Sequence, residues 1–189
     1  NGETYDFERI RASLEAKGCH FRTGSDSEVI IHLYREFGLG CFEQLRGEFA
    51  FLLYDRARRM LIAARDRFGI KPLYYSRDDN GRYVFASEMK AIYASGLVVP
   101  KLNAAGFDPL LDQEPEKPRL PFENIEHVPP ATYIAIDLET GKATSARYWS
   151  DELPDEIVKL VVEPADETAA SSARAILESE LSKAQARQS

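Results

Sequence analysis

The sequence predicts an α+β fold in which antiparallel hairpins build layered sheets and helices cover them. Three pairs of apolar runs are each separated by a short turn signal, which is typical of hairpins. The run EFAFLLYD is almost continuously apolar, as expected for a strand that is buried on both faces in a layered sandwich. Apolar residues at helical spacing near the start of the sequence supply the helical layer.

Two helices are predicted before the first strand. The first begins near Phe7, carries apolar residues at helical spacing and ends before Gly18. The second follows Ser25, which lies three residues before Glu28 in a capping-box pattern, and ends before Gly38. Its expected buried stripe is Val29, Ile30, Leu33 and Phe37.

Three hairpins follow. EFAFLLYD turns at residues 56–59 and returns as MLIAARD. LYYSR and RYVFAS are joined through Asn80 and Gly81, which tolerate a positive φ. TYIAIDL and ATSARYW are joined by ETGK. Short helices are expected around Phe42 and over residues 88–95.

The composition changes after residue 100. Six of the ten prolines lie between Pro109 and Pro130, so residues 100–130 predict a long Pro-rich loop. The end of the sequence is acidic and then helical in its pattern. We therefore predict a domain over residues 1–149, followed by an acidic linker and a C-terminal helix over residues 150–189.

Charge and cysteine content exclude several classes of function. The sequence has 24 basic and 31 acidic residues, and its net charge of −7 disfavours nucleic acid and anionic membranes as partners. No apolar run approaches the roughly 18 residues that cross a bilayer. Cys19 and Cys41 are too few for a disulfide framework and lack the spacing of a zinc site. We therefore expect no metal and a reducing, cytoplasmic location.

Five motifs occur in the order, and close to the spacing, of a known family. They are NGETYD, FRTGSDSEVIIHLY, LRGEFAFLLYD, ARDRFGIKPLYY and FASEMKAIY. The corresponding family patterns are NGEIYN, FRTGSDTEVI, LxGMFAFxLxD, ARDRxGIKPLYY and FASExKAL. The sequence from residue 1 to about residue 149 therefore resembles the glutaminase domain, a class II glutamine amidotransferase domain, of asparagine synthetases.

The resemblance implies an N-terminal-nucleophile sandwich of the α/β/β/α type, with two antiparallel sheets face to face and helices outside. It also implies hydrolysis of glutamine, in which an N-terminal cysteine attacks the side-chain amide and its own α-amine is the base. The ammonia then passes to a second, ATP-using domain that makes asparagine. We expect glutamine or a similar small amino acid as the ligand and no cofactor in this chain, since ATP and Mg²⁺ would come only with the synthetase domain.

Asn1 and Gly2 match the oxyanion-hole residues of the family. Amide hydrolysis passes through a tetrahedral oxyanion, which needs hydrogen-bond donors placed where the charge develops. An Asn side-chain N–H and a neighbouring Gly backbone N–H form such a pair, and glycine permits close approach of the backbone. Without the flanking motif, Asn-Gly would be interpreted as a turn.

Glu3 and Asp26 match the acidic residues that hold glutamine, and Gly24 and Ser25 belong to the same substrate-binding motif. A carboxylate facing the α-ammonium group of an amino acid is a favourable charge match. Structural roles stay open for both acids. Asp26 would cap the helix that follows it, and Glu3 would be a first-turn acid that the helix dipole favours.

Arg65, Asp66, Arg67 and Gly69 are interpreted as structural support. Gly69 shapes a tight turn in the motif ARDRFGIKPLYY. The three charged side chains are expected to form an ion-pair cluster that supports the pocket or an interface with a partner domain.

The resemblance also implies parts that the 189 residues do not contain. The family's nucleophilic cysteine precedes the NGE motif, and its SGGLDSS-type ATP loop follows the glutaminase domain. Cys19 and Cys41 have no free α-amine, and the adjacent Cys19 and His20 would point opposite ways in an extended segment. We therefore expect a domain that is truncated at the N-terminus, lacks the synthetase domain and is catalytically impaired or inert. Ala131 replaces a family glycine, which indicates a relaxed constraint there.

The implied sandwich would be incomplete, with an open sheet edge beside EFAFLLYD. We expect a homodimer, a partner chain or the C-terminal helix to cover that edge. Two alternatives to an inert domain stay open. One is a fragment of an active glutamine-hydrolysing asparagine synthetase. The other is a binding or regulatory module, or a different small-molecule activity in a remodelled cleft.

Overall fold

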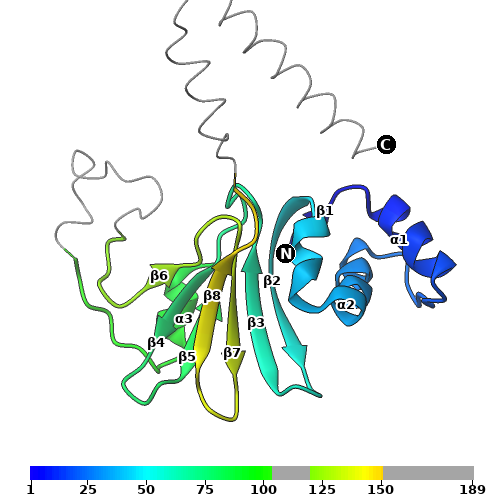
Figure 1. The fold of residues 1–189 in the computed structure, drawn as a ribbon. Coiled ribbons are helices and arrows are strands. Elements are labelled where there is room, and N and C mark those ends of the chain that lie inside the picture. Colours follow the sequence, from blue (N-terminus) through cyan, green and yellow to red (C-terminus); the bar gives the residue numbers. More distant parts are fainter. Residues whose placement is uncertain (104–119, 151–189) are drawn as a thin grey trace, which may run out of the picture. The chain divides into compact units, whose positions relative to one another are not determined.

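The computed structural model describes residues 1–103 and 120–150. Within them two antiparallel sheets stack face to face, with helices on both outer sides, in the predicted order α/β/β/α (Figure 1). The centre of the Pro-rich loop, the acidic linker and the C-terminal helix of the prediction lie outside the described residues.

The predicted helices before residue 100 are confirmed. They are α1 (Phe7–Ala16), α2 (Asp26–Phe37) and α3 (Met89–Ala94), and the short helix around Phe42 is the 3₁₀ helix η1 (Gly38–Gln44). Gly38 ends α2 with a positive φ of 57°, a conformation that favours glycine. None of the helices in residues 1–103 and 120–150 combines the length and apolarity that crossing a bilayer requires.

All three predicted hairpins are also confirmed. The five-stranded sheet has the order β1 (Gly2–Thr4), β2 (Gly47–Asp55), β3 (Met60–Arg65), β7 (Thr132–Asp137) and β8 (Ala143–Arg147). The three-stranded sheet has the order β5 (Tyr83–Ala86), β4 (Tyr74–Arg77) and β6 (Glu126–His127). Strands β1 and β6 were not predicted, since three and two residues are too few to show a period-2 pattern.

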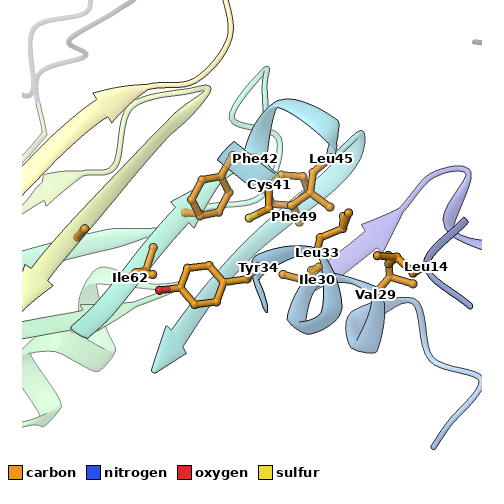
Figure 2. Close-up of a cluster of buried hydrophobic side chains, with 12 residues drawn as sticks. Leu14, Val29, Ile30, Leu33, Tyr34, Cys41, Phe42, Leu45, Phe49 and Ile62 are labelled. Atoms are coloured by element: carbon orange, nitrogen blue, oxygen red, sulfur yellow. The ribbon is translucent and has the colours of Figure 1, made fainter. Parts of the chain in front are cut away.

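Each interface between layers has its own apolar cluster. The largest lies between the five-stranded sheet and the helices α1, α2 and η1, and Phe42, Leu33 and Ile62 are fully or almost fully buried in it (Figure 2). A second cluster, around Ala63 and Val128, lies between the two sheets. A third is Ile92, Val98 and Ile125, where α3 packs on the outer face of the three-stranded sheet.

Two burial predictions are wrong. On α2, Phe37 is 40% exposed and Tyr34, which is 6% exposed, takes its place in the core. On β2, Leu52 and Tyr54 are 47% and 54% exposed, although the apolar run predicted burial on both faces. That face of β2 joins the cluster between the sheets only at Ala50, so the second sheet does not cover the outer half of the strand.

Two glycines allow β1 to lie against β2. Gly2 and Gly47 have φ values of 129° and 130°, which L side chains rarely adopt. A methyl group at Gly2 would collide with the carbonyl oxygen of Glu48, and one at Gly47 would collide with that of Glu3. The close approach of these two strands therefore requires glycine on both of them.

Candidate functional site

The backbone of β1 presents a free hydrogen-bond donor at Gly2. The backbone nitrogen of Asn1 donates to the carbonyl oxygen of Ala50 at 3.0 Å, and the Asn1 carbonyl oxygen accepts from the Ala50 N–H at 3.0 Å. No peptide bond among the described residues is cis. Because the Asn1 carbonyl points toward β2 across a trans peptide, the Gly2 N–H points the opposite way, off the edge of the sheet.

Asp26 lies at the same edge. Its Oδ2 accepts a hydrogen bond from the Thr4 backbone N–H at 2.8 Å, which ties the start of α2 to β1. The Thr4 N–H is two residues beyond that of Gly2, a separation of about 7 Å along a strand. The predicted oxyanion donor and the predicted substrate carboxylate therefore face one side of one strand.

A cavity of about 800 Å³ opens at this edge, between α2 and β2. Asn1, Gly2, Asp26 and Ser27 are among the residues that line it. Its walls are largely apolar and include Ile30, Ile31, Tyr34, Phe49, Phe51 and Leu53. The structure thus brings together three of the six residues that the sequence predicted for catalysis and substrate binding.

The other three, Glu3, Gly24 and Ser25, do not line the cavity. Glu3 lies opposite Glu48 in the β1–β2 register, on the face of the sheet that Gly2 and Thr4 do not share. The Glu48 carboxylate beside it accepts from the Tyr5 hydroxyl at 3.1 Å and pairs with Lys71 Nζ at 3.1 Å. A role for Glu3 in holding substrate stays a prediction.

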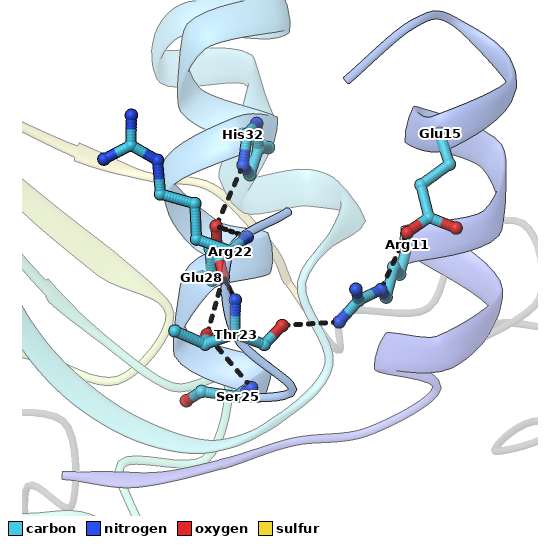
Figure 3. Close-up of polar contacts among 7 residues, drawn as sticks. All are labelled: Arg11, Glu15, Arg22, Thr23, Ser25, Glu28 and His32. Atoms are coloured by element: carbon cyan, nitrogen blue, oxygen red, sulfur yellow. Dashed lines mark hydrogen bonds and ion pairs between the residues drawn. The ribbon is translucent and has the colours of Figure 1, made fainter. Parts of the chain in front are cut away.

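The turn before α2 differs from the predicted capping box. Ser25 is the N-cap, but its Oγ accepts from the Ser27 N–H at 3.2 Å and not from Glu28. The Glu28 carboxylate reaches back past Ser25 and accepts from the N–H groups of Arg22 and Thr23 at 2.8 and 2.7 Å (Figure 3). Asp26 is the first residue of the helix, so the interpretation of Asp26 as the cap is wrong.

These hydrogen bonds favour the ionised form of Glu28. The Thr23 hydroxyl donates to Oε2 at 2.6 Å, and this contact and the backbone N–H of Arg22 are the main reasons that the pKa of Glu28 falls from 4.5 to about 2. His32 Nε2 lies 3.5 Å from Oε1 on the following turn of the helix. Glu28 thereby fixes the segment that carries Gly24 and leads into Asp26.

Arg65 and Asp66 organise the loop that follows β3, called here the 66–71 loop. Asp66 is fully buried, and its carboxylate accepts from the N–H groups of Phe68, Ile70 and Lys71 at 2.9 to 3.1 Å. The Arg65 guanidinium donates to the carbonyl oxygens of Gly69, Lys71 and Val128 at 2.5 to 2.8 Å. The two side chains supply the backbone of the loop with complementary partners.

The predicted ion-pair cluster of Arg65, Asp66 and Arg67 is therefore wrong in its partners. No salt bridge joins these side chains in the part of the chain that the structure describes. Arg67 donates from Nη2 to the carbonyl oxygen of Glu43 at 3.1 Å. At Gly69, φ is 65°, and a methyl group would lie 3.0 Å from the Arg65 guanidinium carbon.

The constraint at Ala131 is not relaxed, contrary to the prediction. Its φ is 54°, in the left-handed region, and the residue is fully buried. Its N–H donates to the Asp66 carbonyl at 2.8 Å and its carbonyl accepts from the Tyr148 N–H at 2.8 Å. Position 131 keeps the left-handed backbone conformation that favours the glycine found in the family. The alanine in this chain therefore carries some backbone strain.

Comparison with known proteins identifies the family of this chain. The family model described as "Glutamine amidotransferase domain" matches residues 1–149. The chain belongs to the glutamine amidotransferase domain family. The motif resemblance to the glutaminase domain of asparagine synthetases is thereby confirmed.

The curated relatives of this amidotransferase domain carry two kinds of name. Asparagine synthetase [glutamine-hydrolyzing] 3 of Bacillus subtilis is 35% identical over 156 residues, which is 80% of this chain and 25% of the relative. Amidase chry2 of Gibberella zeae is 41% identical over 160 residues, which is 84% of this chain and 23% of the relative. The chain thus spans about a quarter of the length of these relatives.

The fold of the amidotransferase domain is also found among solved structures. Glutamine phosphoribosylpyrophosphate amidotransferase from B. subtilis matches with a TM-score of 0.57 and 24% identity, over 81% of this chain and 29% of that chain. At this identity the likeness concerns the fold alone. It confirms the predicted sandwich of antiparallel sheets.

Neither cysteine of the chain is placed in the cavity of the amidotransferase domain. Cys41 is fully buried, and burial raises the pKa of its thiol to about 12. Cys19 packs against the cluster under the helices, on the segment that follows α1. Both are free thiols.

The sequence did not reveal two contacts beside the cavity. Thr4 holds Asp26 through its backbone N–H, which leaves no trace in residue type. Glu28 was identified as a capping residue, but its partners Arg22 and Thr23 were not. Threonine two residues before the N-cap was the available signal, since its hydroxyl can bond to nearby backbone and acidic groups.

Replacing Glu28 by Gln is expected to flatten the acid dependence of stability. Because the pKa of Glu28 is lower in the folded state than its ordinary value, its contribution is fully present above about pH 4.5 and is lost as the pH falls toward 2. Urea unfolding at pH 7, 4.5, 3 and 2 measures the effect. The free energy of unfolding of the parent protein should fall more steeply below pH 4.5 than that of Glu28→Gln.

Glu8→Gln is the matched control for removing one carboxylate, because Glu8 lies in the first turn of α1 and has no hydrogen-bond or salt-bridge partner among the described residues. Its pH profile should follow that of the parent protein. Equal slopes for the parent and Glu28→Gln below pH 4.5 would show that the Glu28 contacts carry no pH-dependent stability.

Proposed function

We propose that residues 1–149 form the glutamine-binding part of an asparagine synthetase-type glutaminase. The observation that carries the proposal is the common edge of β1, where the Gly2 N–H and the Asp26 carboxylate face one cavity. The Gly2 N–H and the Asn1 side chain would donate to the oxygen of the substrate's side-chain amide. Asp26 would receive the α-ammonium group.

The geometry suits the charges that develop in amide hydrolysis. A donor fixed by a β-ladder needs no reorganisation when the carbonyl oxygen becomes an oxyanion, and this preorganisation is the main source of its effect. Asp26 uses Oδ2 for Thr4, so Oδ1 is the oxygen left for a ligand, with the hydroxyls of Ser25 and Ser27 3.5 and 3.4 Å away. Hydrogen-bond donors would thus hold the side-chain amide of glutamine, and a carboxylate would hold its α-ammonium group.

Glutamine binding is tested with Asp26→Asn, which keeps an oxygen for the Thr4 N–H and removes the charge. A hydrogen bond to a charged group contributes about 1.5–3 kcal/mol, so affinity for glutamine should fall about 10- to 100-fold. Isothermal titration calorimetry of the 189-residue chain gives the dissociation constants. Asp79→Asn, an exposed acid in the β4–β5 turn, is the control and should bind as the parent does.

We further propose that the 189-residue chain binds glutamine without hydrolysing it efficiently. The support is the placement of its two thiols, since neither lines the cavity and Cys41 is held protonated by burial. An oxyanion hole without a nucleophile retains about 10³–10⁴-fold acceleration over water in the protease template.

Ammonia release from glutamine should therefore exceed the uncatalysed rate by at most about 10³–10⁴-fold, and it should be insensitive to iodoacetamide. A coupled glutamate dehydrogenase assay, with and without alkylation, measures it. Rapid release that alkylation blocks would overturn the proposal of an inert domain. It would favour the alternative of an active enzyme, with Cys19 or Cys41 as nucleophile.

A different amide substrate is the second candidate. Two relatives at 41% and 40% identity are named amidases, and the apolar walls of the cavity extend well beyond Asp26. Both candidates use the same oxyanion donors, and they differ in what Asp26 binds. Tighter binding of an N-acylated amide than of glutamine, unaffected by Asp26→Asn, would favour an amidase or a binding module.

The partners and the location of the protein are part of the proposal. The outer backbone edge of β2 from Phe51 to Asp55 pairs with no strand among the described residues, and the exposed Leu52, Tyr54 and Ile31 flank it. Such an edge favours pairing with another polypeptide, so we expect a homodimer or a partner chain there. Light scattering that shows a monomer at high concentration would argue against self-association.

The two free thiols suit a reducing, cytoplasmic compartment. Residues 1–149 are proposed to need no cofactor of their own. If this domain works with a synthetase domain, ATP and Mg²⁺ would act there.

A further inference from the structure

The loop that follows β3 displays two large apolar side chains to solvent near Trp149. In the 66–71 loop, Phe68 is 67% exposed and Ile70 is 53% exposed. The buried carboxylate of Asp66 and the guanidinium of Arg65 bond to the backbone between them, so the loop cannot easily fold these side chains inward. Large apolar groups that a fixed loop exposes together mark a binding surface more often than isolated ones do.

Aromatic groups and an arginine extend this surface. Phe68 meets Trp149 edge to face with ring centroids 5.3 Å apart. The Arg67 guanidinium carbon lies 5.4 Å from the centroid of the Trp149 ring. Tryptophan and arginine are the residue types that contribute most often to the centre of protein interfaces.

Two arginines here have no carboxylate partner among the described residues. Arg67 uses Nη2 for the Glu43 carbonyl, while its buried Nε has no hydrogen-bond partner. Arg46 lies three residues beyond Glu43, and its side chain has no hydrogen bond or salt bridge within residues 1–103 and 120–150. Burial, and then the charge of Arg46, lower the pKa of Arg67. An anion at this point would relieve the repulsion between the two guanidinium groups.

We propose that Arg46, Arg67 and the exposed tip of the 66–71 loop form a docking site for a polypeptide segment that carries a carboxylate between apolar side chains. The carboxylate would bind the guanidinium groups, and the apolar side chains would cover Phe68 and Ile70. The site lies outside the cavity at β1 and does not depend on the proposed glutamine binding.

Charge decides which occupant fits. Inorganic phosphate would satisfy the arginines but leave Phe68 and Ile70 in water. A nucleic acid is disfavoured by the net charge of −7. The same face of a second copy would bring four unpaired arginines together, which is unfavourable in a symmetric dimer. An acidic and apolar segment of a different polypeptide surface satisfies both features.

Trp149 is the single tryptophan of the sequence, so its fluorescence reports directly on this site. The probes are the capped peptides Leu-Glu-Phe-Glu-Leu and Leu-Gln-Phe-Gln-Leu, titrated into the 189-residue chain with excitation at 295 nm. We expect a saturable change with the Glu peptide and at least ten-fold weaker binding of the Gln peptide. Equal binding of the two, or no binding of either, would overturn the proposal.

Arg46→Gln is the informative variant, because the Arg46 side chain makes no hydrogen bond or salt bridge among the described residues. Arg46→Gln should lower the affinity for the Glu peptide at least five-fold, while the free energy of unfolding measured in urea stays unchanged. Arg56→Gln removes an exposed, unpaired arginine from the β2–β3 turn and should bind as the parent does. Equal loss in both variants would indicate general electrostatics, and inorganic phosphate that gives the same fluorescence change would indicate a simple anion site. Either result would contradict the proposed partner.

Discussion

The buried carboxylate of Asp66 is the interaction on which most of this domain depends. A carboxylate without water is tolerated only if hydrogen bonds replace its hydration, and Asp66 obtains them from the backbone of the 66–71 loop. Its own backbone joins two strands, since its N–H donates to Phe49 on β2 and its carbonyl accepts from Ala131 before β7. One residue thus fixes the loop and the neighbouring ends of two strands.

Asp66 connects the core to the β1 edge and to the exposed tip of the 66–71 loop. Phe49 lies directly opposite Gly2 in the β1–β2 register, so Asp66 is bonded to the residue that faces the proposed oxyanion donor. On its other side, the same carboxylate holds the loop that exposes Phe68 and Ile70. Asp66 thus lies between the edge proposed to bind an amide and the surface proposed to dock a polypeptide.

The amino-acid sequence predicts the hairpins and helices well because local chemistry determines them. Turn residues such as Gly81, and apolar spacing in the helices, act over a few positions. Burial was less predictable, since Leu52 and Tyr54 are exposed only because the second sheet ends before it reaches them. The ion-pair prediction for Arg65 and Asp66 failed for a related reason. A tight loop has many backbone groups to satisfy, and these are closer to both side chains than the two charges are to each other.

The site shows a similar division. Residue types identified Asn1, Gly2 and Asp26 through the family motif, and the structure gathers them at one cavity. The direction of the Gly2 N–H depends on which way one peptide faces in a ladder, and that information lies in the pairing of Asn1 with Ala50. Glu3 is adjacent in sequence, yet the alternation of a strand sends its side chain to the other face.

The outward peptide at Gly2 also has a spectroscopic consequence. An amide hydrogen that lies outside the ladder exchanges with solvent deuterium far faster than its ladder-bonded neighbours, even within a well-ordered strand. Gly2 should therefore label quickly and Glu3 slowly. A ligand carbonyl oxygen that accepts from the Gly2 N–H would slow the exchange of this hydrogen. Ligand binding at this edge can therefore be followed at a single backbone amide.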